Sequence, residues 1–299
     1  MQNQNKKFRG TGVAIVTPFK KSGAIDFNAY GNLLDFVIEG GVDYIVALGT
    51  TGEAPTLSGQ EKKAFVEFSV GKIHKRVPLV VGIGGNNTSE VVSAIRAMPL
   101  KGVDAILSVS PYYNKPQQEG IYRHFKAVAE ASPLPVILYT VPGRTGSNIA
   151  ATTTIRLAKD FPNIIGIKEA SGNLDQIYQV LKQRPTDFLV ISGDDGLTLP
   201  MLSVGAHGVI SVAANAYPKE FSAMVRLGLK GNFIKAREFH FLLIDFINAL
   251  FADGSPAGIK AALKRKKLCR DTLRLPLVPV NKDIENLMYK LIDQIEGKK

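Results

Sequence analysis

The stretch Ile164-Ile165-Gly166-Ile167-Lys168-Glu169 is a short apolar run, rich in β-branched residues, that ends in two charged residues. Similar runs recur along the first three quarters of the chain, at 13–16, 44–48, 79–83, 105–109, 136–139, 188–191 and 209–212. None shows the polar alternation of a half-exposed sheet, and this pattern is typical of parallel strands buried on both faces. We therefore predict eight buried parallel strands.

Amphipathic stretches of helical length lie between these runs, at 27–39, 60–74, 88–98, 118–131 and 174–183. Successive runs begin roughly 20–35 residues apart, which is the length of one βα unit. Eight such units predict an α/β fold in which a closed (β/α)8 TIM barrel is favoured over an open doubly wound sheet. The glycines at 82–87 lack the spacing of a dinucleotide-binding fingerprint, so we interpret them as a loop after the third strand.

The pattern changes after about residue 230, where three helical stretches follow one another at 233–251, 256–268 and 282–295. No low-complexity linker precedes them. We therefore predict a catalytic barrel at 1–230 and a C-terminal helical domain at 231–299 that packs against it.

Composition excludes several classes of protein. The chain has 299 residues, of which 45% are hydrophobic and 21% charged, unlike disordered or collagen-like chains. No apolar run approaches the roughly 18–20 residues that cross a bilayer, and the first ten residues lack the apolar segment of a signal peptide. The single cysteine, Cys269, excludes an internal disulfide and a zinc cluster. We expect a cytoplasmic protein without a membrane partner.

The net charge is +11, and much of the excess lies between residues 260 and 270. The cations there are Lys260, Lys264, Arg265, Lys266, Lys267 and Arg270. No aromatic side chain accompanies them to stack on bases, which argues against binding of single-stranded nucleic acid. We interpret the stretch as the solvated face of a C-terminal helix and keep a non-catalytic nucleic-acid-binding or scaffold role as an alternative.

Functional residues of a TIM barrel lie at the carboxyl ends of its strands. Lys168 ends the sixth strand, inside a barrel that should be apolar. Burial favours the neutral amine, which can attack a ketone and form a Schiff base. The alternatives are an ion pair with Glu169 or an amine that reaches solvent. Glu169 should point to the opposite face of the strand, so we interpret it as structural.

Other strand ends carry polar groups that suit a keto acid. Tyr139 ends the fifth strand and could relay protons, and Arg144 follows on a Pro-Gly turn where its planar guanidinium suits a carboxylate. Thr50 and Thr51 lie between two glycines after the second strand, where hydroxyl and backbone groups could hold a carboxylate.

The remaining candidates are weaker. Tyr112 and Tyr113 lie on a proline-bounded loop that is typical of an interface, and 192–195 and 210–211 could supply the pocket floor. Asp194 and Asp195 resemble a paired-carboxylate acid/base site or a metal ligand set, but we interpret them as helix caps, the commoner role of aspartates at the start of a helix. The four histidines, at 74, 124, 207 and 240, do not have the spacing of metal ligands, and we expect no metal site. His74 and His124 lie in predicted helices, where we expect them on the surface.

Five of these segments together resemble the dihydrodipicolinate synthases of the pyruvate-dependent class I aldolase superfamily. They are Gly-Thr-Thr-Gly-Glu (49–53), Pro-Tyr-Tyr-Asn-Lys-Pro (111–116), Val-Pro-Gly-Arg-Thr (141–145), Gly-Ile-Lys-Glu-Ala-Ser-Gly (166–172) and Ser-Gly-Asp-Asp (192–195). The resemblance runs from about residue 10 to 280. The lysine motif marks the superfamily, whereas 111–116 and the Arg144 loop favour the synthase over the alternative, an N-acetylneuraminate lyase or related sugar-acid aldolase.

The resemblance implies that Lys168 forms a Schiff base with pyruvate and that the enamine attacks L-aspartate-4-semialdehyde, on the route to lysine and diaminopimelate. It implies no cofactor or metal, and a homotetramer built from two tight dimers. By the same resemblance, Tyr139, Thr50 and Tyr113 form a proton relay, with Tyr113 coming from a neighbouring subunit. Thr50 and Thr51 would bind the carboxylate of pyruvate, and Arg144 would bind that of the semialdehyde. Gly193 and the Ile210 carbonyl would complete the pocket.

The chain departs from the family pattern at a few positions. Thr140 stands where asparagine is common, and we expect little effect. A possible lysine-inhibition site is matched by Ala54, Asn86, Glu90 and Tyr112, but Gly59 and Lys62 stand where sensitive members often carry histidines. Because the Lys62 ammonium would repel lysine, we expect weak or absent inhibition.

Overall fold

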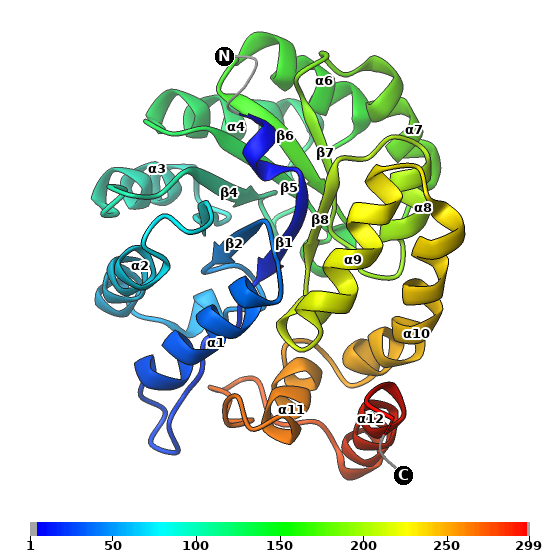
Figure 1. Ribbon diagram of the computed structural model, residues 1–299. Helices are drawn as coiled ribbons and strands as arrows, with labels where there is room; N and C mark the ends of the chain where they lie inside the picture. The colour runs from blue at the N-terminus through cyan, green and yellow to red at the C-terminus, as the bar shows by residue number, and fades with distance from the viewer. Residues whose placement is uncertain (1–4, 298–299) are drawn as a thin grey trace.

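The computed structural model describes residues 5–297, and its strands close into one parallel barrel in the order β1 to β8 (Figure 1). Strand β8 pairs with β1, which closes the barrel. The predicted (β/α)8 barrel is therefore confirmed. The strands are β1 (Gly10–Ala14), β2 (Tyr44–Ala47), β3 (Leu79–Gly82), β4 (Ala105–Val109), β5 (Val136–Thr140), β6 (Ile164–Glu169), β7 (Leu189–Ser192) and β8 (Gly208–Ser211).

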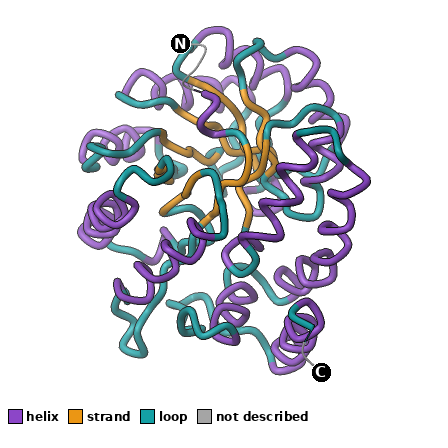
Figure 2. The backbone as a smooth tube through the Cα atoms, viewed as in Figure 1, coloured by secondary structure: helices purple, strands orange, loops and turns teal. Residues whose placement is uncertain are grey.

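Helices surround the barrel on the outside (Figure 2). Four of the predicted helices, α1, α4, α7 and α12, begin and end at the predicted residues. The helices are α1 (Phe27–Glu39), α2 (Gly59–Ile73), α3 (Thr88–Ala97), α4 (Gln118–Ala131), α5 (Pro142–Thr145), α6 (Ala151–Asp160), α7 (Leu174–Gln183), α8 (Thr198–Ser203), α9 (Pro218–Leu229), α10 (Phe233–Ala252), α11 (Ala257–Arg265) and α12 (Lys282–Ile295), with short 3-10 turns η1 (Asn5–Phe8), η2 (Ala54–Thr56) and η3 (Ala213–Asn215).

The first strand lies earlier in the chain than its apolar run predicts. It spans Gly10–Ala14 rather than 13–16. A Cβ atom on Gly12 would lie 2.2 Å from the Tyr44 ring, so glycine allows β1 to pass close beside that ring. A Cβ atom on Gly10 would likewise lie 2.1 Å from the Asp43 carboxylate, so the two glycines that interrupt the apolar run are what let β1 pack here.

Apolar side chains form two layers, one inside the barrel and one between the strands and the helices. Tyr44, Ile137 and Ile191 belong to the inner layer, whereas Ile45, Leu138 and similar residues belong to the outer one. Burial on both faces explains why the strand sequences lack polar alternation.

Helix α10 lies beside α8 and α9, and α11 and α12 pack against α10 and against each other at the bottom of the view in Figure 1. Their buried residues, among them Phe246, Ile259 and Met288, belong to the same apolar core as Val225 of α9. The division at residues 230 and 231 stays a prediction, with one continuous core on both sides of it.

Two predictions about exposure were wrong. Lys260 was expected on a solvated face, but it is fully buried, because its neighbours in α11 are apolar and it has an acidic partner within the core. His124 was expected on a helix surface, but it is buried and its Nδ1 lies 2.9 Å from the Thr88 hydroxyl. Burial lowers the pKa of His124 to about 4.

Within residues 5–297, no helix combines the length and the apolar character needed to cross a membrane. The predicted absence of a signal peptide concerns a segment that includes residues 1–4, which lie outside the described residues.

Candidate active site

Lys168 and Tyr139 lie side by side at the carboxyl ends of β6 and β5. The two residues are paired in register, and the Lys168 Nζ lies 4.3 Å from the centre of the Tyr139 ring. Each side chain is only 6% exposed. The alternative in which Lys168 reaches solvent is therefore excluded, and a buried amine next to a phenol is available for imine chemistry.

A one-residue shift of register determines which way Lys168 points. Val136 pairs with Ile164, but Ile137 pairs with Gly166, so Ile165 is passed over. Ile137 and Tyr139 belong to the inner layer of the barrel. Because Lys168 pairs with Tyr139, the Lys168 side chain also lies on the inner side of the barrel. An extra residue in a strand changes the face to which the following side chains point.

Glu169 is a structural residue, as predicted. Its Oε1 accepts a hydrogen bond from the Ser171 N–H at 2.7 Å, and its Oε2 accepts one from the Gln176 amide at 2.9 Å. Burial raises the pKa of its carboxyl group. Since both oxygens are bound elsewhere, the predicted alternative of a Lys168–Glu169 ion pair is not what the structure contains.

Gly193 follows β7 and lies directly against Lys168. Its N–H donates to the Glu169 carbonyl at 2.7 Å, and a Cβ atom on Gly193 would lie 2.9 Å from the Lys168 Cε. Ile210 of β8 is buried in the inner layer of the barrel. Both residues thus face the part of the barrel that contains Lys168, although their contact with a substrate stays a prediction.

The turn after β2 carries Thr50, which is exposed, and Thr51, which is buried. The Glu53 N–H donates to the Thr50 carbonyl at 3.1 Å, which closes the turn. The Thr17 hydroxyl donates to the Gly52 carbonyl at 2.7 Å. These bonds hold the turn tightly, as a carboxylate site requires.

The loops after β4 and β5 meet at the same end of the barrel. The Tyr113 N–H donates to the Thr145 carbonyl at 3.2 Å, and Thr145 ends α5, the short helix that carries the exposed Arg144. Tyr113 has a left-handed backbone (φ 73°) and a side chain that is 88% exposed. The Tyr113 backbone therefore contacts the Arg144 segment, while its ring lies open to the surroundings of this chain.

The four residues of the possible lysine site come from the segments that follow the neighbouring strands β2, β3 and β4. Ala54 is in η2, Glu90 is in α3 and accepts a hydrogen bond from the Asn87 amide, and Asn86 lies in the loop after β3. The Asn114 amide donates to the Asn86 carbonyl at 3.5 Å, and this bond joins that loop to the one that carries Tyr112. Inhibition at this place stays a prediction.

Asp194 and Asp195 accept backbone hydrogen bonds, but neither is the N-cap residue of a helix, since Leu197 precedes α8 and Val212 precedes η3. Asp194 accepts from the Leu197 N–H, whereas Asp195 reaches across to the N–H groups of Val212 and Ala213 at the start of η3. Burial raises the pKa of Asp195 to about 6. Across residues 5–297, no three His, Cys, Asp or Glu side chains are grouped so as to hold a metal ion.

Sequence reasoning missed a buried polar cluster beside the Thr50–Thr51 turn. Glu53 and Lys260 form an ion pair with both side chains fully buried, and Arg274 contacts the same carboxylate through its backbone. Burial lowers the pKa of Lys260, and the Glu53 carboxylate opposes that effect. The available signal was the apolar neighbourhood of Lys260, which stands between Ile259 and Ala261.

A sequence profile described as the "Dihydrodipicolinate synthetase family" matches residues 7–295. The chain belongs to this family. The 4-hydroxy-tetrahydrodipicolinate synthase of Flavobacterium psychrophilum is 54% identical over 288 residues, covering 96% of this chain and 98% of the relative. The prediction of the family, and of an enzyme of this type, is therefore confirmed.

Two solved structures of dihydrodipicolinate synthases have the same fold. The enzyme from Cyanidioschyzon merolae, described with lysine bound, is 38% identical with a TM-score of 0.94, over 97% of this chain and 99% of that one. Another, described as the first monomeric variant of the synthase, is 37% identical with a TM-score of 0.95, over 98% and 99% of the two chains. Both similarities extend over nearly the whole chain.

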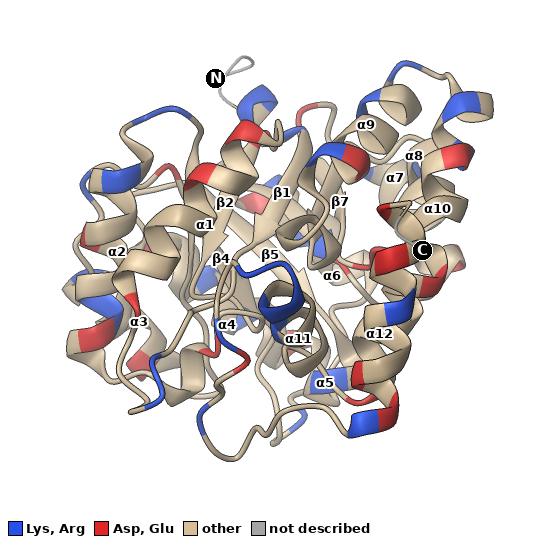
Figure 3. Ribbon diagram, turned by 60° about the horizontal axis from the view of Figure 1, so that its bottom comes forward, with Lys and Arg blue, Asp and Glu red and all other residues tan. Residues whose placement is uncertain are grey.

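The family assignment gives no support to a nucleic-acid-binding scaffold, and neither does the charge distribution. Lys and Arg alternate with Asp and Glu over the outer helices in Figure 3. In the basic stretch, Lys264 pairs with Asp271, and Arg265 pairs with Asp293. Cations that are neutralised by nearby carboxylates make a poor phosphate-binding face.

Proposed function

We propose that this chain condenses pyruvate with L-aspartate-4-semialdehyde and forms 4-hydroxy-tetrahydrodipicolinate. The observation that carries the proposal is the buried Lys168 amine over the Tyr139 ring at the carboxyl end of the barrel, in a chain that belongs to the synthase family. A nucleophilic amine in an apolar pocket is the group that imine formation requires.

The reaction begins when the Lys168 amine attacks the ketone carbon of pyruvate and water leaves, which gives an imine. Loss of a proton from the methyl group gives an enamine, and its carbon attacks the aldehyde of the semialdehyde to form a new carbon–carbon bond. The substrate's amino group then attacks the imine carbon, closes the ring and releases Lys168. In this proposal Tyr139, whose ring centre lies 4.3 Å from the amine, passes the protons in these steps.

The other residues bind and orient the two substrates in this proposal. Thr50 and Thr51 hold the pyruvate carboxylate, and Arg144 holds the carboxylate of the semialdehyde. Gly193 leaves room for Lys168 and the adduct, and the Ile210 carbonyl completes the pocket. No cofactor or metal takes part.

The proposed assembly is a homotetramer in which Tyr113 completes the proton relay of a neighbouring subunit. The high exposure and strained backbone of Tyr113 support this role, because a large aromatic side chain held open to the surroundings suits an interface. A similar protein is described as a monomeric variant, so the assembly of this chain is to be measured. Analytical ultracentrifugation or mass photometry gives the mass of the assembly in solution. Its location in the cytoplasm stays a prediction.

The experiment is reductive trapping. The protein is incubated with pyruvate and borohydride, and the modified peptide is located by mass spectrometry. We expect one pyruvate-derived adduct, on Lys168, together with turnover of aspartate semialdehyde and none of N-acetylmannosamine. An adduct elsewhere, or none, contradicts the mechanism, and turnover of the amino sugar alone favours a sugar-acid aldolase.

A further inference from the structure

The turn that carries Thr50 and Thr51 ends at Glu53, and the Glu53 carboxylate is bound by two residues from the C-terminal part of the chain, Lys260 and Arg274. One carboxylate oxygen, Oε1, pairs with the Lys260 Nζ, and the other, Oε2, accepts a hydrogen bond from the Arg274 N–H at 3.1 Å. The Glu53 and Lys260 side chains are fully buried, although they are 207 residues apart in the sequence. Both oxygens of Glu53 are thus held by groups that follow the barrel.

Lys260 is itself fixed on two further sides. Its Nζ donates to the Thr272 carbonyl at 2.9 Å and lies 4.3 Å from the centre of the Phe19 ring. Phe19 belongs to the loop after β1, so Lys260 joins helix α11, the segment after that helix and the carboxyl end of the barrel. A buried ammonium with this many partners has little freedom to move.

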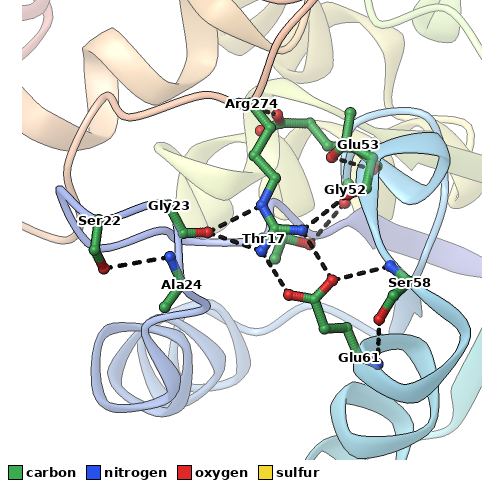
Figure 4. A network of polar contacts seen from close by, with 10 residues as sticks. Thr17, Ser22, Gly23, Ala24, Gly52, Glu53, Ser58, Glu61 and Arg274 are labelled. Atoms are coloured by element: carbon green, nitrogen blue, oxygen red, sulfur yellow. Dashed lines mark hydrogen bonds and ion pairs between the residues drawn. The ribbon is translucent and has the colours of Figure 1, made fainter.

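The Arg274 side chain forms further contacts between the C-terminal segment and the loops at the carboxyl end of the barrel. Its guanidinium donates to the Gly23 carbonyl, to the Thr56 carbonyl and to both Glu61 oxygens (Figure 4). These acceptors lie after β1 and on both sides of the turn from η2 to α2. The C-terminal segment is therefore tied to the loops that follow the first two strands.

The backbone transmits the position of Glu53 directly to the threonines. Glu53 has a left-handed conformation (φ 52°), and its N–H donates to the Thr50 carbonyl. A non-glycine residue keeps such a conformation only where its surroundings hold it. Here those surroundings include the Lys260 and Arg274 contacts on its carboxylate, together with the hydrogen bonds that the Thr56 N–H and hydroxyl donate to its carbonyl.

We propose that Lys260 is a positioning residue, which acts through Glu53 to hold the 49–53 turn in the shape that binds the pyruvate carboxylate. The inference rests on the proposed role of Thr50 and Thr51. A neutral side chain at residue 260 leaves the Glu53 carboxylate buried without its cation, so its position is no longer fixed and it takes up a proton or moves towards water. The turn moves with it, and small misplacements of binding groups cost much of their effect.

The test uses the half-saturating pyruvate concentration for borohydride trapping on Lys168, which needs no second substrate. For Lys260→Met we expect this concentration to rise about tenfold. Lys264→Met is the matched control, because Lys264 lies on the same helix, is exposed and pairs with Asp271 and Glu285 rather than with Glu53. We expect the control to keep the wild-type value.

A second variant separates positioning from stability. Glu53→Gln combined with Lys260→Met removes both buried charges, so it should fold better than Lys260→Met alone. We expect its melting temperature to recover while its half-saturating pyruvate concentration stays raised, because no cation then holds residue 53.

The outcomes are decisive in each case. A folded single or double variant with wild-type half-saturation overturns the positioning role, and so does failure of both variants to fold, which assigns the pair to stability alone. If the unmodified protein forms no adduct on Lys168, the proposed function fails instead, before any variant is compared.

Discussion

The Lys168 side chain occupies space that only a glycine at residue 193 leaves open. A Cβ atom there would lie 2.9 Å from the Lys168 Cε, 3.1 Å from its Cγ and 2.7 Å from the Ala170 Cβ. The Gly193 N–H is also bound to the Glu169 carbonyl at 2.7 Å, so the backbone has little room to move away. The direction of the amine therefore depends on a missing side chain on the neighbouring strand.

We predict that Gly193→Ala slows adduct formation with pyruvate by at least about tenfold, because the new methyl group displaces the amine that must attack. The measurement is the rate of borohydride-trapped adduct at saturating pyruvate. Gly71→Ala is the control, since nothing lies within 4 Å of a Cβ atom at that position. Equal trapping rates in the two variants would show that Lys168 tolerates the methyl group.

Arg144→Ala should separate the two substrates. Arg144 is exposed on α5 and is proposed to hold only the semialdehyde, so we expect the KM for the semialdehyde to rise about tenfold or more while trapping of pyruvate on Lys168 stays close to wild type. Steady-state kinetics with each substrate varied in turn measures this. Arg123→Ala, an exposed residue paired with Glu119 on α4, is the control. A parallel loss of pyruvate trapping would place Arg144 in the first half-reaction.

Lysine should inhibit this protein weakly or not at all. Lys62 is half-buried in the first turns of α2, close in sequence to Ala54. Its ammonium group carries the same positive charge as the amino groups of free lysine and would repel them. Repulsion of that kind is worth about 1 kcal/mol or more when partly desolvated. Activity measured against increasing lysine tests this, with Lys62→His as the variant expected to gain sensitivity. Complete inhibition of the unmodified protein at sub-millimolar lysine would contradict the prediction.

His124 should make the protein less stable in acid. Burial lowers its pKa to about 4, below the roughly 6.5 of an unfolded chain, so the unfolded state binds a proton first as the pH falls. The contribution of neutral His124 to the free energy of unfolding is fully present above about pH 6.5 and decreases as the pH falls towards 4. Between pH 7 and pH 5 the loss is about 2 kcal/mol.

Urea unfolding of the wild type and of His124→Asn at both pH values measures that loss. Asp195, whose pKa is raised to about 6, acts in the opposite direction, but it is present in both proteins and cancels in the comparison. His74→Asn is the control for a histidine replaced at an exposed site. If the His124→Asn protein loses as much stability as the wild type, His124 does not cause the effect.

Much of the fold was predictable because local patterns determined it. The apolar runs and the amphipathic stretches each carry their own period, so eight strands and the bounds of helices such as 118–131 followed from the sequence alone. Lys168 and Tyr139 were predictable as a pair because both end strands that the barrel order makes neighbours. Their position at the carboxyl ends follows from the architecture.

The contacts of the C-terminal segment were not predictable in the same way. The apolar neighbours of Lys260 hint that it is buried, but nothing local names its partner: Lys260 is buried on Glu53, whereas Lys264, four residues later on the same helix, is exposed. The sequence by itself determined the strands, the helices and the residues at the strand ends, since these depend on periodicity and strand order. The register shift between β5 and β6, the burial of His124 and the partner of Lys260 were decided only by the tertiary structure, because each depends on packing between segments far apart in the chain.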